Sequence, residues 1–435
     1  MPDEQPVHIH WFRRDLRLTD HRVLHQAVRS GYPVVPLFIF DRDILDRLEN
    51  RTDRRVHFIH RQLQRLKKTL QTVGSDLVVK TGRPEGVWRE VLSASNVASV
   101  SVVRDYEPYA RERDQAIWSL LKENGVRLSG YKDQVIFERS DILTKAGDPF
   151  KVFTPYAKQW RRHLQESDLE SFDVDLSAFQ KLDPSPLPSL DDLGFRPVSD
   201  LPAADPRPLP LDIIKGYRET RDLPGQSGTT RLGVHLRFGT LSIRELVRLA
   251  RTANPTFLNE LVWREFFQMV LWHHPESVHR AIRPEYDRIE WEENPDHFQA
   301  WCEGQTGYPM VDAGMRELNE TGFMHNRARM VAAGFLCKHL LIDWRKGERY
   351  FASRLIDFEC ASNVGNWQWA AGSGHDAAPW FRIFNPIRQQ ERFDPDLHYA
   401  RKFLPEYGTT AYPEPIIEHA KARERALDRY RRALK

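Results

Sequence analysis

Short apolar runs alternate with amphipathic stretches over the first 124 residues, and this alternation limits the possible folds most. The runs 7–11, 34–40, 77–79 and 97–103 have the length and composition of strands. Patterns typical of helices lie between or after them, at 20–30, 54–73, 85–94 and 108–124. Strands that alternate with helices at this spacing predict a doubly wound parallel sheet covered by helices. The turn after the first run, Phe12-Arg13-Arg14-Asp15, lacks the glycine fingerprint of dinucleotide-binding folds.

The rest of the chain changes character twice. Eight prolines crowd into residues 184–210, so we expect no helix or strand there. Beyond Leu211, apolar residues recur at helical spacing over 243–252, 256–274, 310–320, 326–341 and 348–355. A length of 435 residues also exceeds one ordinary core. We predict an α/β domain over 1–135, a connecting segment over 136–210 and an all-α domain over 211–435, which ends in a basic, solvated helix.

Composition excludes several classes of protein. Three scattered cysteines, Cys302, Cys337 and Cys360, provide neither a disulfide framework nor a four-cysteine metal or iron–sulfur site. We therefore expect no metal site and a reducing cytoplasm. No apolar run is long enough to span a bilayer, and the polar start Met1 to Gln5 does not resemble a secretory signal. A net charge of +3 permits nucleic-acid binding without arguing for it.

Three polar segments of the helical domain are candidates for a site. Glu260, Trp263, Arg264 and Phe267 share one helix face, which suits a pocket that stacks a base, or a surface ion pair between Glu260 and Arg264. The segments 323–330 and 357–369 are similarly dense in charged, amide and tryptophan side chains. Glycine and proline over 357–386 argue against one regular helix, so we expect site loops there. A fourth segment, the hydroxyl-rich loop 225–231, could hold phosphates or simply turn the chain.

Six motifs carry a family resemblance. They are Trp-Phe-Arg-Arg-Asp-Leu-Arg at 11–17, the loop 228–232, Trp-Arg-Glu-Phe at 263–266, Thr-Gly-Tyr-Pro at 306–309 with Asp312, the segment 325–330, and Asn-Trp-Gln-Trp at 366–369 with Asn-Pro at 385–386. The chain resembles the photolyase/cryptochrome family from Val7 to about Tyr407, and most closely its bacterial class I cyclobutane pyrimidine dimer photolyases. The resemblance implies an N-terminal antenna domain and a C-terminal helical domain that binds FAD.

The resemblance also assigns FAD contacts. They are Tyr217, Thr229, Thr230, Arg231, Leu232, Gly233, Phe257, Arg264, Asn326, Arg329, Asp357, Glu359 and Asn363. Asn363 is expected to face the flavin N5, and Arg329 to pair with Asp357. Two positions depart from the family pattern: Gly233 stands where a serine is common, and Glu359 where an aspartate is common. The first removes a hydroxyl from the phosphate cradle and the second shifts a contact, but neither is expected to abolish binding.

The implied activity is light-driven repair of DNA. In this family, excited FADH⁻ donates an electron to a flipped-out pyrimidine dimer, the cyclobutane ring opens, and the electron returns. The implied lesion and DNA contacts are Glu260, Trp263, Arg264, Phe267, Asn326, Arg327, Met330, Trp369, Arg221 and Arg382. Trp367, Trp344 and Trp291 are expected to carry electrons to oxidised flavin, although core packing is the default role of any one tryptophan. UV-damaged DNA is the expected partner of a monomeric protein.

Several alternatives stay open. Arg55, Asp105 and Glu107 resemble antenna-pocket residues; Glu107 is compatible with a folate, whereas Asp105 and Arg55 favour a deazaflavin. Helix capping and surface charge would also explain them. A cryptochrome-type light receptor is disfavoured by Asn363 and by the short C-terminal tail. A six-four photoproduct enzyme is disfavoured because Asn326, Arg329 and Met330 stand where histidines are expected at the lesion.

Overall fold

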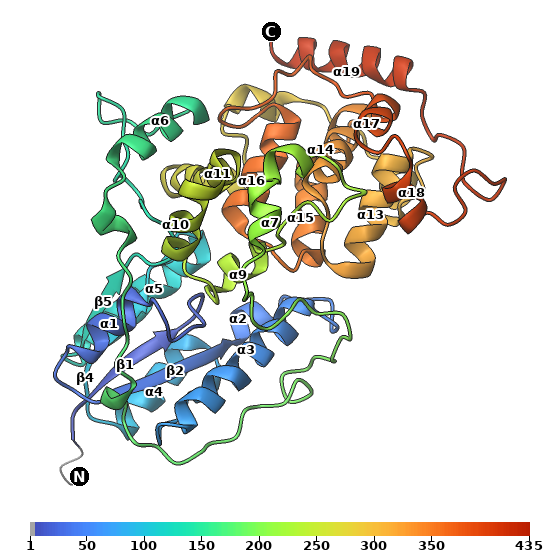
Figure 1. The fold of residues 1–435 in the computed structure, drawn as a ribbon. Coiled ribbons are helices and arrows are strands. Elements are labelled where there is room, and N and C mark those ends of the chain that lie inside the picture. Colours follow the sequence, from blue (N-terminus) through green and yellow to red (C-terminus); the bar gives the residue numbers. More distant parts are fainter. Residues whose placement is uncertain (1–4) are drawn as a thin grey trace. The chain divides into compact units, whose positions relative to one another are not determined.

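A computed structural model describes residues 5–435. Most of the segment Met1 to Gln5, which was predicted not to be a secretory signal, therefore lies outside the described residues. The described chain forms two compact units. One unit contains residues up to 138 together with 164–209 and 232–249, and the other contains 139–163, 210–231 and 250–435. The first is an α/β unit and the second is helical, which confirms the predicted fold class (Figure 1).

The α/β unit is built on one parallel sheet of five strands. These are β1 (Val7–Phe12), β2 (Val34–Asp41), β3 (Val78–Gly82), β4 (Val97–Val103) and β5 (Arg127–Tyr131), in the order β3-β2-β1-β4-β5. Its helices are α1 (Arg22–Val28), α2 (Arg42–Leu45), α3 (Arg54–Gln71), α4 (Pro84–Ala94), α5 (Pro108–Glu123), α9 (Gly233–Phe238) and most of α10 (Ile243–Ala253). The edge strand β5 escaped prediction because its sequence, Arg-Leu-Ser-Gly-Tyr, has no apolar run.

Alternate residues of β1 face opposite sides of the sheet, as strand geometry requires. Ile9 and Trp11 enter an apolar cluster with residues of α4 and α5, where Trp11 meets Trp88 edge-on at 5.6 Å. His8 and His10 point to the other side and bond serine hydroxyls of β4. The first strand therefore carries both an apolar and a polar buried face.

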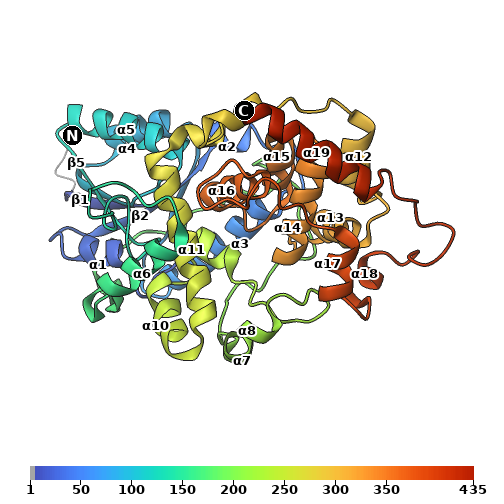
Figure 2. The same cartoon turned by 90° about the horizontal axis from the view of Figure 1, so that it is seen from above.

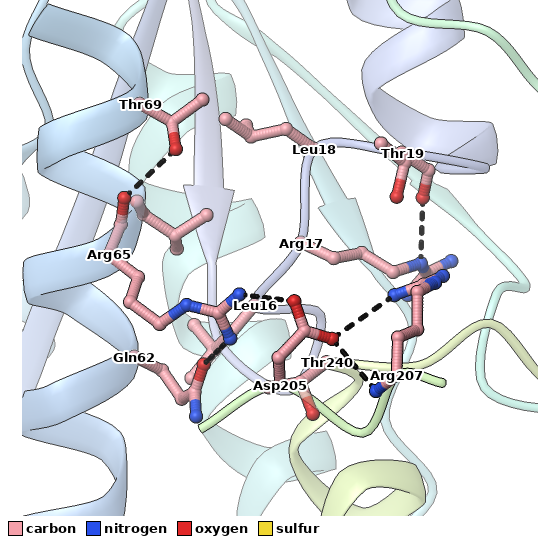
Figure 3. A pocket seen from close by; sticks show the side chains of 11 residues that line it. Leu16, Arg17, Leu18, Thr19, Gln62, Arg65, Thr69, Asp205, Arg207 and Thr240 are labelled. Carbon is pink, nitrogen blue, oxygen red and sulfur yellow. Dashed lines mark hydrogen bonds and ion pairs between the residues drawn. The ribbon is translucent and has the colours of Figure 1, made fainter. Parts of the chain in front are cut away.

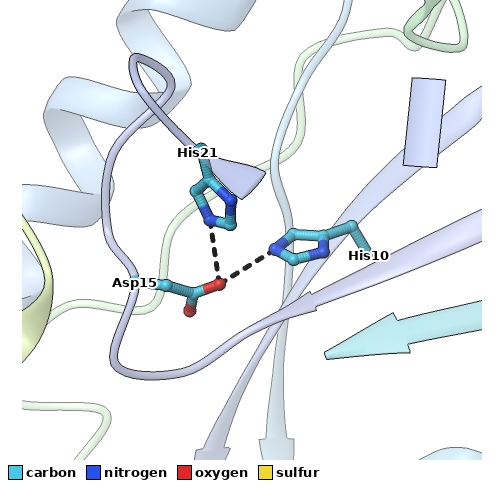
Figure 4. A group of neighbouring side chains, drawn as sticks. All are labelled: His10, Asp15 and His21. Atoms are coloured by element: carbon cyan, nitrogen blue, oxygen red, sulfur yellow. Dashed lines mark hydrogen bonds and ion pairs between the residues drawn. The ribbon is translucent and has the colours of Figure 1, made fainter. Parts of the chain in front are cut away.

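The polar face of β1 fixes the turn that follows the strand. Asp15 accepts hydrogen bonds from His10 and His21, each at 3.0 Å, and all three side chains are buried (Figure 4). Burial alone would raise the pKa of Asp15, but these two hydrogen bonds hold it well below its usual range. Because His21 also accepts from the amide of Leu24, it caps α1. Hydrogen bonding within the protein thus accounts for this His-Asp-His group.

The proline-rich stretch 184–210 contains no helix or strand, as predicted. It passes a cavity of about 500 Å³ in the α/β unit (Figure 3). Asp205 of the stretch lies between Arg65, at 2.7 Å, and Arg207, at 3.8 Å, and Arg207 also bonds Glu245. The charged groups beside this cavity are therefore paired with one another.

The helical unit surrounds a central helix, α16 (Cys360–Ala371), which contacts α11, α14 and α15 (Figure 2). The unit's helices before α16 are α6 (Phe153–His163), α7 (Leu211–Lys215), α8 (Tyr217–Thr220), α11 (Pro255–His273), α12 (Pro295–Glu303), α13 (Pro309–Thr321), α14 (Asn326–Gly334) and α15 (Trp344–Arg354). Those after it are α17 (Pro386–Phe393), α18 (His398–Phe403) and α19 (His419–Ala433). No helix among residues 5–435 is both long and apolar enough to cross a membrane.

No single helix runs over 357–386, as expected, and residues 372–385 contain neither helix nor strand. Two finer expectations about this unit are wrong. Residues 360–371 form a regular helix rather than a site loop, because Gly365 is a point of helix contact: a Cβ there would lie 2.2 Å from the ring of Phe267. The helix predicted over 326–341 ends at Gly334 and continues as a π-helical turn, Phe335–His339. Such turns often occur at functional sites.

Candidate functional site

Helix α11 carries the first set of candidate residues. Asn254 caps it by accepting from the amides of Thr256 and Phe257, and Pro255 occupies the first turn, where its missing N–H costs nothing. This start sets the register that places Glu260, Trp263, Arg264 and Phe267 along one stripe.

The two charged residues of this stripe have partners elsewhere in the chain. Glu260 bonds Arg221, and Arg264 bonds Glu359 at 2.8 Å. The alternative of a local Glu260–Arg264 ion pair is therefore wrong. Gln268 adds an amide hydrogen bond to Glu359 at 3.1 Å. Burial raises the pKa of Glu260, and the neighbouring Arg221 partly offsets that shift.

The aromatic residues of the stripe form a stack. Trp263 lies parallel to Phe153 of α6, with ring centres 3.6 Å apart, and Phe267 follows at 5.4 Å. Phe267 in turn fills the space that Gly365 leaves open. Phe153 is a member of this wall that the sequence did not single out.

Arg329 and Asp357 form the predicted ion pair, with 2.9 Å between guanidinium nitrogen and carboxylate oxygen. Near them in sequence, the amide nitrogen of Asn363 donates to Glu348 at 2.8 Å. Among residues 5–435, no side chain or backbone amide donates a hydrogen bond to the Asn363 amide oxygen. This assignment leaves that oxygen as a free acceptor.

The loop before α9 has the properties of a phosphate cradle. Thr229 and Thr230 are half-buried, whereas Arg231 is exposed and adopts a left-handed backbone with φ of 52°. Gly228 is required for a close approach, because a Cβ there would lie 2.5 Å from Thr220. Of the next two residues, Leu232 is buried and Gly233 is exposed, and both belong to the α/β unit.

Tyr217 and Phe257, two further predicted FAD contacts, meet edge-on at 5.2 Å. The guanidinium of Arg221 lies over the Tyr217 ring at 5.4 Å. Burial raises the pKa of Tyr217, so its hydroxyl stays protonated at neutral pH. Contacts through Arg221 thus link the rings of Tyr217 and Phe257 to Glu260.

Three predicted DNA contacts line one small cavity of about 10 Å³: Met330, Trp369 and Arg382. Lys338 and Phe384 also line it and were not predicted; Gly334, Ala370 and Ala378 complete the lining. Asn326 is exposed at the start of α14, with its amide nitrogen 3.8 Å from the Met330 sulfur.

The three arginines that were predicted to bind the DNA backbone differ in whether a carboxylate already pairs with them. Arg221 bonds Glu260, and Arg327 bonds Asp222 at 2.7 Å. Arg382 is exposed, and no carboxylate among residues 5–435 is recorded as its partner. Arg382 is therefore the most available of the three for a phosphate.

The three tryptophans predicted to carry electrons to the flavin belong to or pack against one hydrophobic cluster, but they differ in burial. Trp367 and Trp344 are buried within it, whereas Trp291 is half-buried and packs against it. Trp301, which was not singled out, lies 6.1 Å from Trp367. Trp291 meets Tyr430 of α19 edge-on at 6.3 Å, so α19, expected to be simply solvated, has a buried face.

In the α/β unit, two of the three antenna candidates lie together. Arg14 bonds Asp105 at 3.0 Å and Glu107 at 3.2 Å. Burial would raise the pKa of Asp105, but Arg14 and Arg237 hold it below its usual range. Arg55 is held at the start of α3 by Asp53, which caps that helix.

Comparisons with known proteins cover nearly the whole chain. Residues 8–175 match the family model of DNA photolyase, and residues 257–411 match the FAD binding domain of DNA photolyase. A deoxyribodipyrimidine photo-lyase of Halobacterium salinarum is 36% identical over 98% of this chain and 99% of its own. The chain belongs to the DNA photolyase family. This confirms the family predicted from the sequence motifs.

Solved photolyases share the fold. A bacterial class III photolyase from Agrobacterium tumefaciens superposes with a TM-score of 0.86 at 34% identity, covering 100% of this chain and 98% of its own. An archaeal photolyase from Sulfolobus tokodaii, described with two FAD molecules, gives the same TM-score at 33% identity, with 98% and 99% covered. The two-part architecture is thus that of photolyases.

Proposed function

We propose that this photolyase-family chain is a deoxyribodipyrimidine photo-lyase that repairs cyclobutane pyrimidine dimers in DNA with light, through bound FAD. One observation carries the proposal: the Arg329–Asp357 pair and the free amide oxygen of Asn363 lie within the region that matches the FAD-binding family model. We also propose that it is a photolyase of the class I type.

The residues present suit FAD. Exposed Arg231 and the hydroxyls of Thr229 and Thr230 offer a positive charge and donors for a pyrophosphate. Arg329, held by Asp357, offers a cation to the flavin ring, and Asn363 offers an acceptor for the N5 proton of the reduced form. Glu359 is held by Arg264 and Gln268, so the longer acid still has a fixed position.

When bound, reduced FAD supplies on excitation the electron that opens the cyclobutane ring and then takes it back. The protein must hold the dimer out of the duplex, which costs least at a poorly stacked lesion. Trp263, braced by Phe153 and Phe267, and Trp369 stack on the flipped bases. Glu260 hydrogen-bonds the dimer with the help of Arg221, and Asn326 and Met330 complete the contact.

Trp367, Trp344 and Trp291 deliver electrons to oxidised flavin in this proposal. Their burial supports it, because the first two are shielded from water while Trp291 reaches the edge of the cluster. An electron taken from the outermost ring can be replaced by a reductant in solution.

We further propose a second chromophore in the α/β unit, beside Arg55, Asp105 and Glu107. The Sulfolobus relative, described with two FAD molecules, gives precedent for such a cofactor. Folate and deazaflavin remain the two candidates from the sequence, with a second flavin as another. The three free cysteines, two buried and Cys360 half-buried, fit the proposed reducing cytoplasm, and we propose that the protein acts as a monomer.

Lesion type is tested with two oligonucleotides of one sequence, one carrying a cyclobutane dimer and the other a six-four photoproduct. The reduced protein is illuminated with blue light and the products are separated by chromatography, with a dark control. We expect repair of the cyclobutane dimer alone. Repair of the six-four lesion alone would replace this proposal with that alternative, and binding without repair would favour a cryptochrome-type receptor.

A further inference from the structure

A buried lysine lies directly behind the proposed DNA surface. Lys338 sits in the π-helical turn and lines the same cavity as Met330, Trp369 and Arg382. Only 3% of Lys338 is exposed, and its ammonium donates to the carbonyl oxygen of Arg382 at 3.0 Å. No carboxylate among residues 5–435 pairs with it.

Burying a lysine without a carboxylate partner lowers the stability of the folded protein. Its neighbours in the turn, Phe335, Leu336 and Cys337, are apolar and buried. An ammonium among such side chains is costly to bury unless it is paired and hydrogen-bonded. Burial lowers the pKa of Lys338 to about 8, with Arg382 adding to the shift. An apolar side chain of similar size would avoid this cost.

The segment 379–384 is anchored mainly by apolar contacts: Trp380 and Ile383 pack against the cluster around Tyr430, and the Phe384 ring lies 6.5 Å from that of Trp369. Within it, the Arg382 amide bonds the carbonyl of Pro379 at 2.8 Å, and Trp380 stacks on Tyr430 at 6.4 Å. In the described part of the chain, Lys338 is the one side chain recorded as donating to the backbone of these residues. Phe381, by contrast, is 60% exposed. Lys338 thus supplies a polar tether to the backbone at Arg382, beside the exposed Phe381 and between residues that are held by apolar packing.

We propose that Lys338 is a positioning residue, whose hydrogen bond to the Arg382 carbonyl holds segment 379–384 so that the Arg382 guanidinium meets a DNA phosphate. The inference rests on the proposed DNA-binding role of Arg382. The cavity of about 10 Å³ holds one water molecule at most, so a phosphate cannot reach the lysine itself. Lys338 acts through the backbone of Arg382.

The tether is tested first without DNA, by hydrogen–deuterium exchange of the intact, FAD-loaded protein. Lys338→Met removes the donor and keeps an unbranched side chain that is one atom shorter. We expect faster exchange of the amides in 379–384 and unchanged exchange in α11 and α13. Lys421→Met, a change at an exposed lysine of α19, is the control and is expected to behave as wild type. Unchanged exchange in 379–384 would overturn the proposal.

The consequence for DNA is tested by a double-mutant cycle on binding of ultraviolet-irradiated oligothymidine. Arg382→Ala is expected to weaken binding and to reduce the salt dependence by about one counterion. Lys338→Met is expected to weaken binding by up to the same factor, about tenfold, and to add nothing in the Arg382→Ala background. Independent, additive losses would overturn the proposed route through Arg382.

Two further measurements keep the outcomes distinct. FAD content and the rate of flavin photoreduction are expected to be unchanged in Lys338→Met, which a general loss of structure would not allow. If that variant fails to fold, Lys338→Leu, which also lacks a donor, replaces it with the same expected exchange. A wild-type protein that binds no irradiated DNA would refute the proposed function, while the exchange experiment would still decide the tether.

Discussion

Gly365→Ala tests the close contact of α16 with α11. The added methyl group would lie 2.2 Å from Cδ1 and 2.6 Å from Cε1 of Phe267, so the ring or a helix must move. Overpacking of this kind costs about 1–3 kcal/mol. In a unit of about 150–250 residues this lowers the melting temperature by about 2–4 °C for each kcal/mol. We therefore expect a fall of about 2–12 °C.

The assay is thermal unfolding by circular dichroism, combined with release of bound FAD. Gly334→Ala is the matched control, because its methyl group would meet nothing closer than Phe384 at 3.9 Å. As a glycine-to-alanine change in a helix, the control is expected to be neutral or to stabilise by up to about 1 kcal/mol. Displacing Phe267 also disturbs Trp263, so Gly365→Ala should bind dimers less tightly. A Gly365→Ala protein as stable as wild type would refute this account of the packing.

Three more predictions concern repair, electron supply and pH. Glu260→Ala should weaken binding of dimer-containing DNA about tenfold, the equivalent of about 1.5 kcal/mol for a hydrogen bond to a charged group, while FAD stays bound; unchanged binding would remove Glu260 from the lesion pocket. Trp367→Phe should abolish photoreduction of oxidised FAD but leave repair by prereduced protein, and transient absorption showing normal photoreduction would contradict the chain. Burial lowers the pKa of His325 to about 4, against 6.5 unfolded, so the unfolded state binds more protons in this range. The resulting stability is complete above about pH 6.5 and lost as pH falls towards 4; urea unfolding that is insensitive to pH across this range would contradict it.

The sequence predicted the sheet well because buried parallel strands have a local signature. The runs at 34–40 and 97–103 are strands in the structure almost to the residue. The edge strand β5 lacks such a run and was missed. Similarly, Gly365 suggested a loop because its reason, the ring of Phe267 almost 100 positions away, lies outside any local window.

The sequence predicted which residues belong to the candidate site better than it predicted which of them contact one another. The Arg329–Asp357 pair followed from the family resemblance and is present. The partner of Arg264 is Glu359, 95 residues away, whereas helical spacing suggested Glu260. Lys338 could not be predicted, because a single lysine among apolar residues is common in sequences. Only the structure shows that its side chain is buried and that its ammonium bonds a backbone carbonyl rather than a carboxylate.

The most direct test of the proposed activity is light-dependent repair. The purified protein, with its FAD reduced, is mixed with ultraviolet-irradiated oligothymidine and exposed to blue light, and the return of thymine absorbance is followed against a dark control. The account predicts recovery in the light and none in the dark. No recovery in the light, with reduced FAD bound, would contradict it.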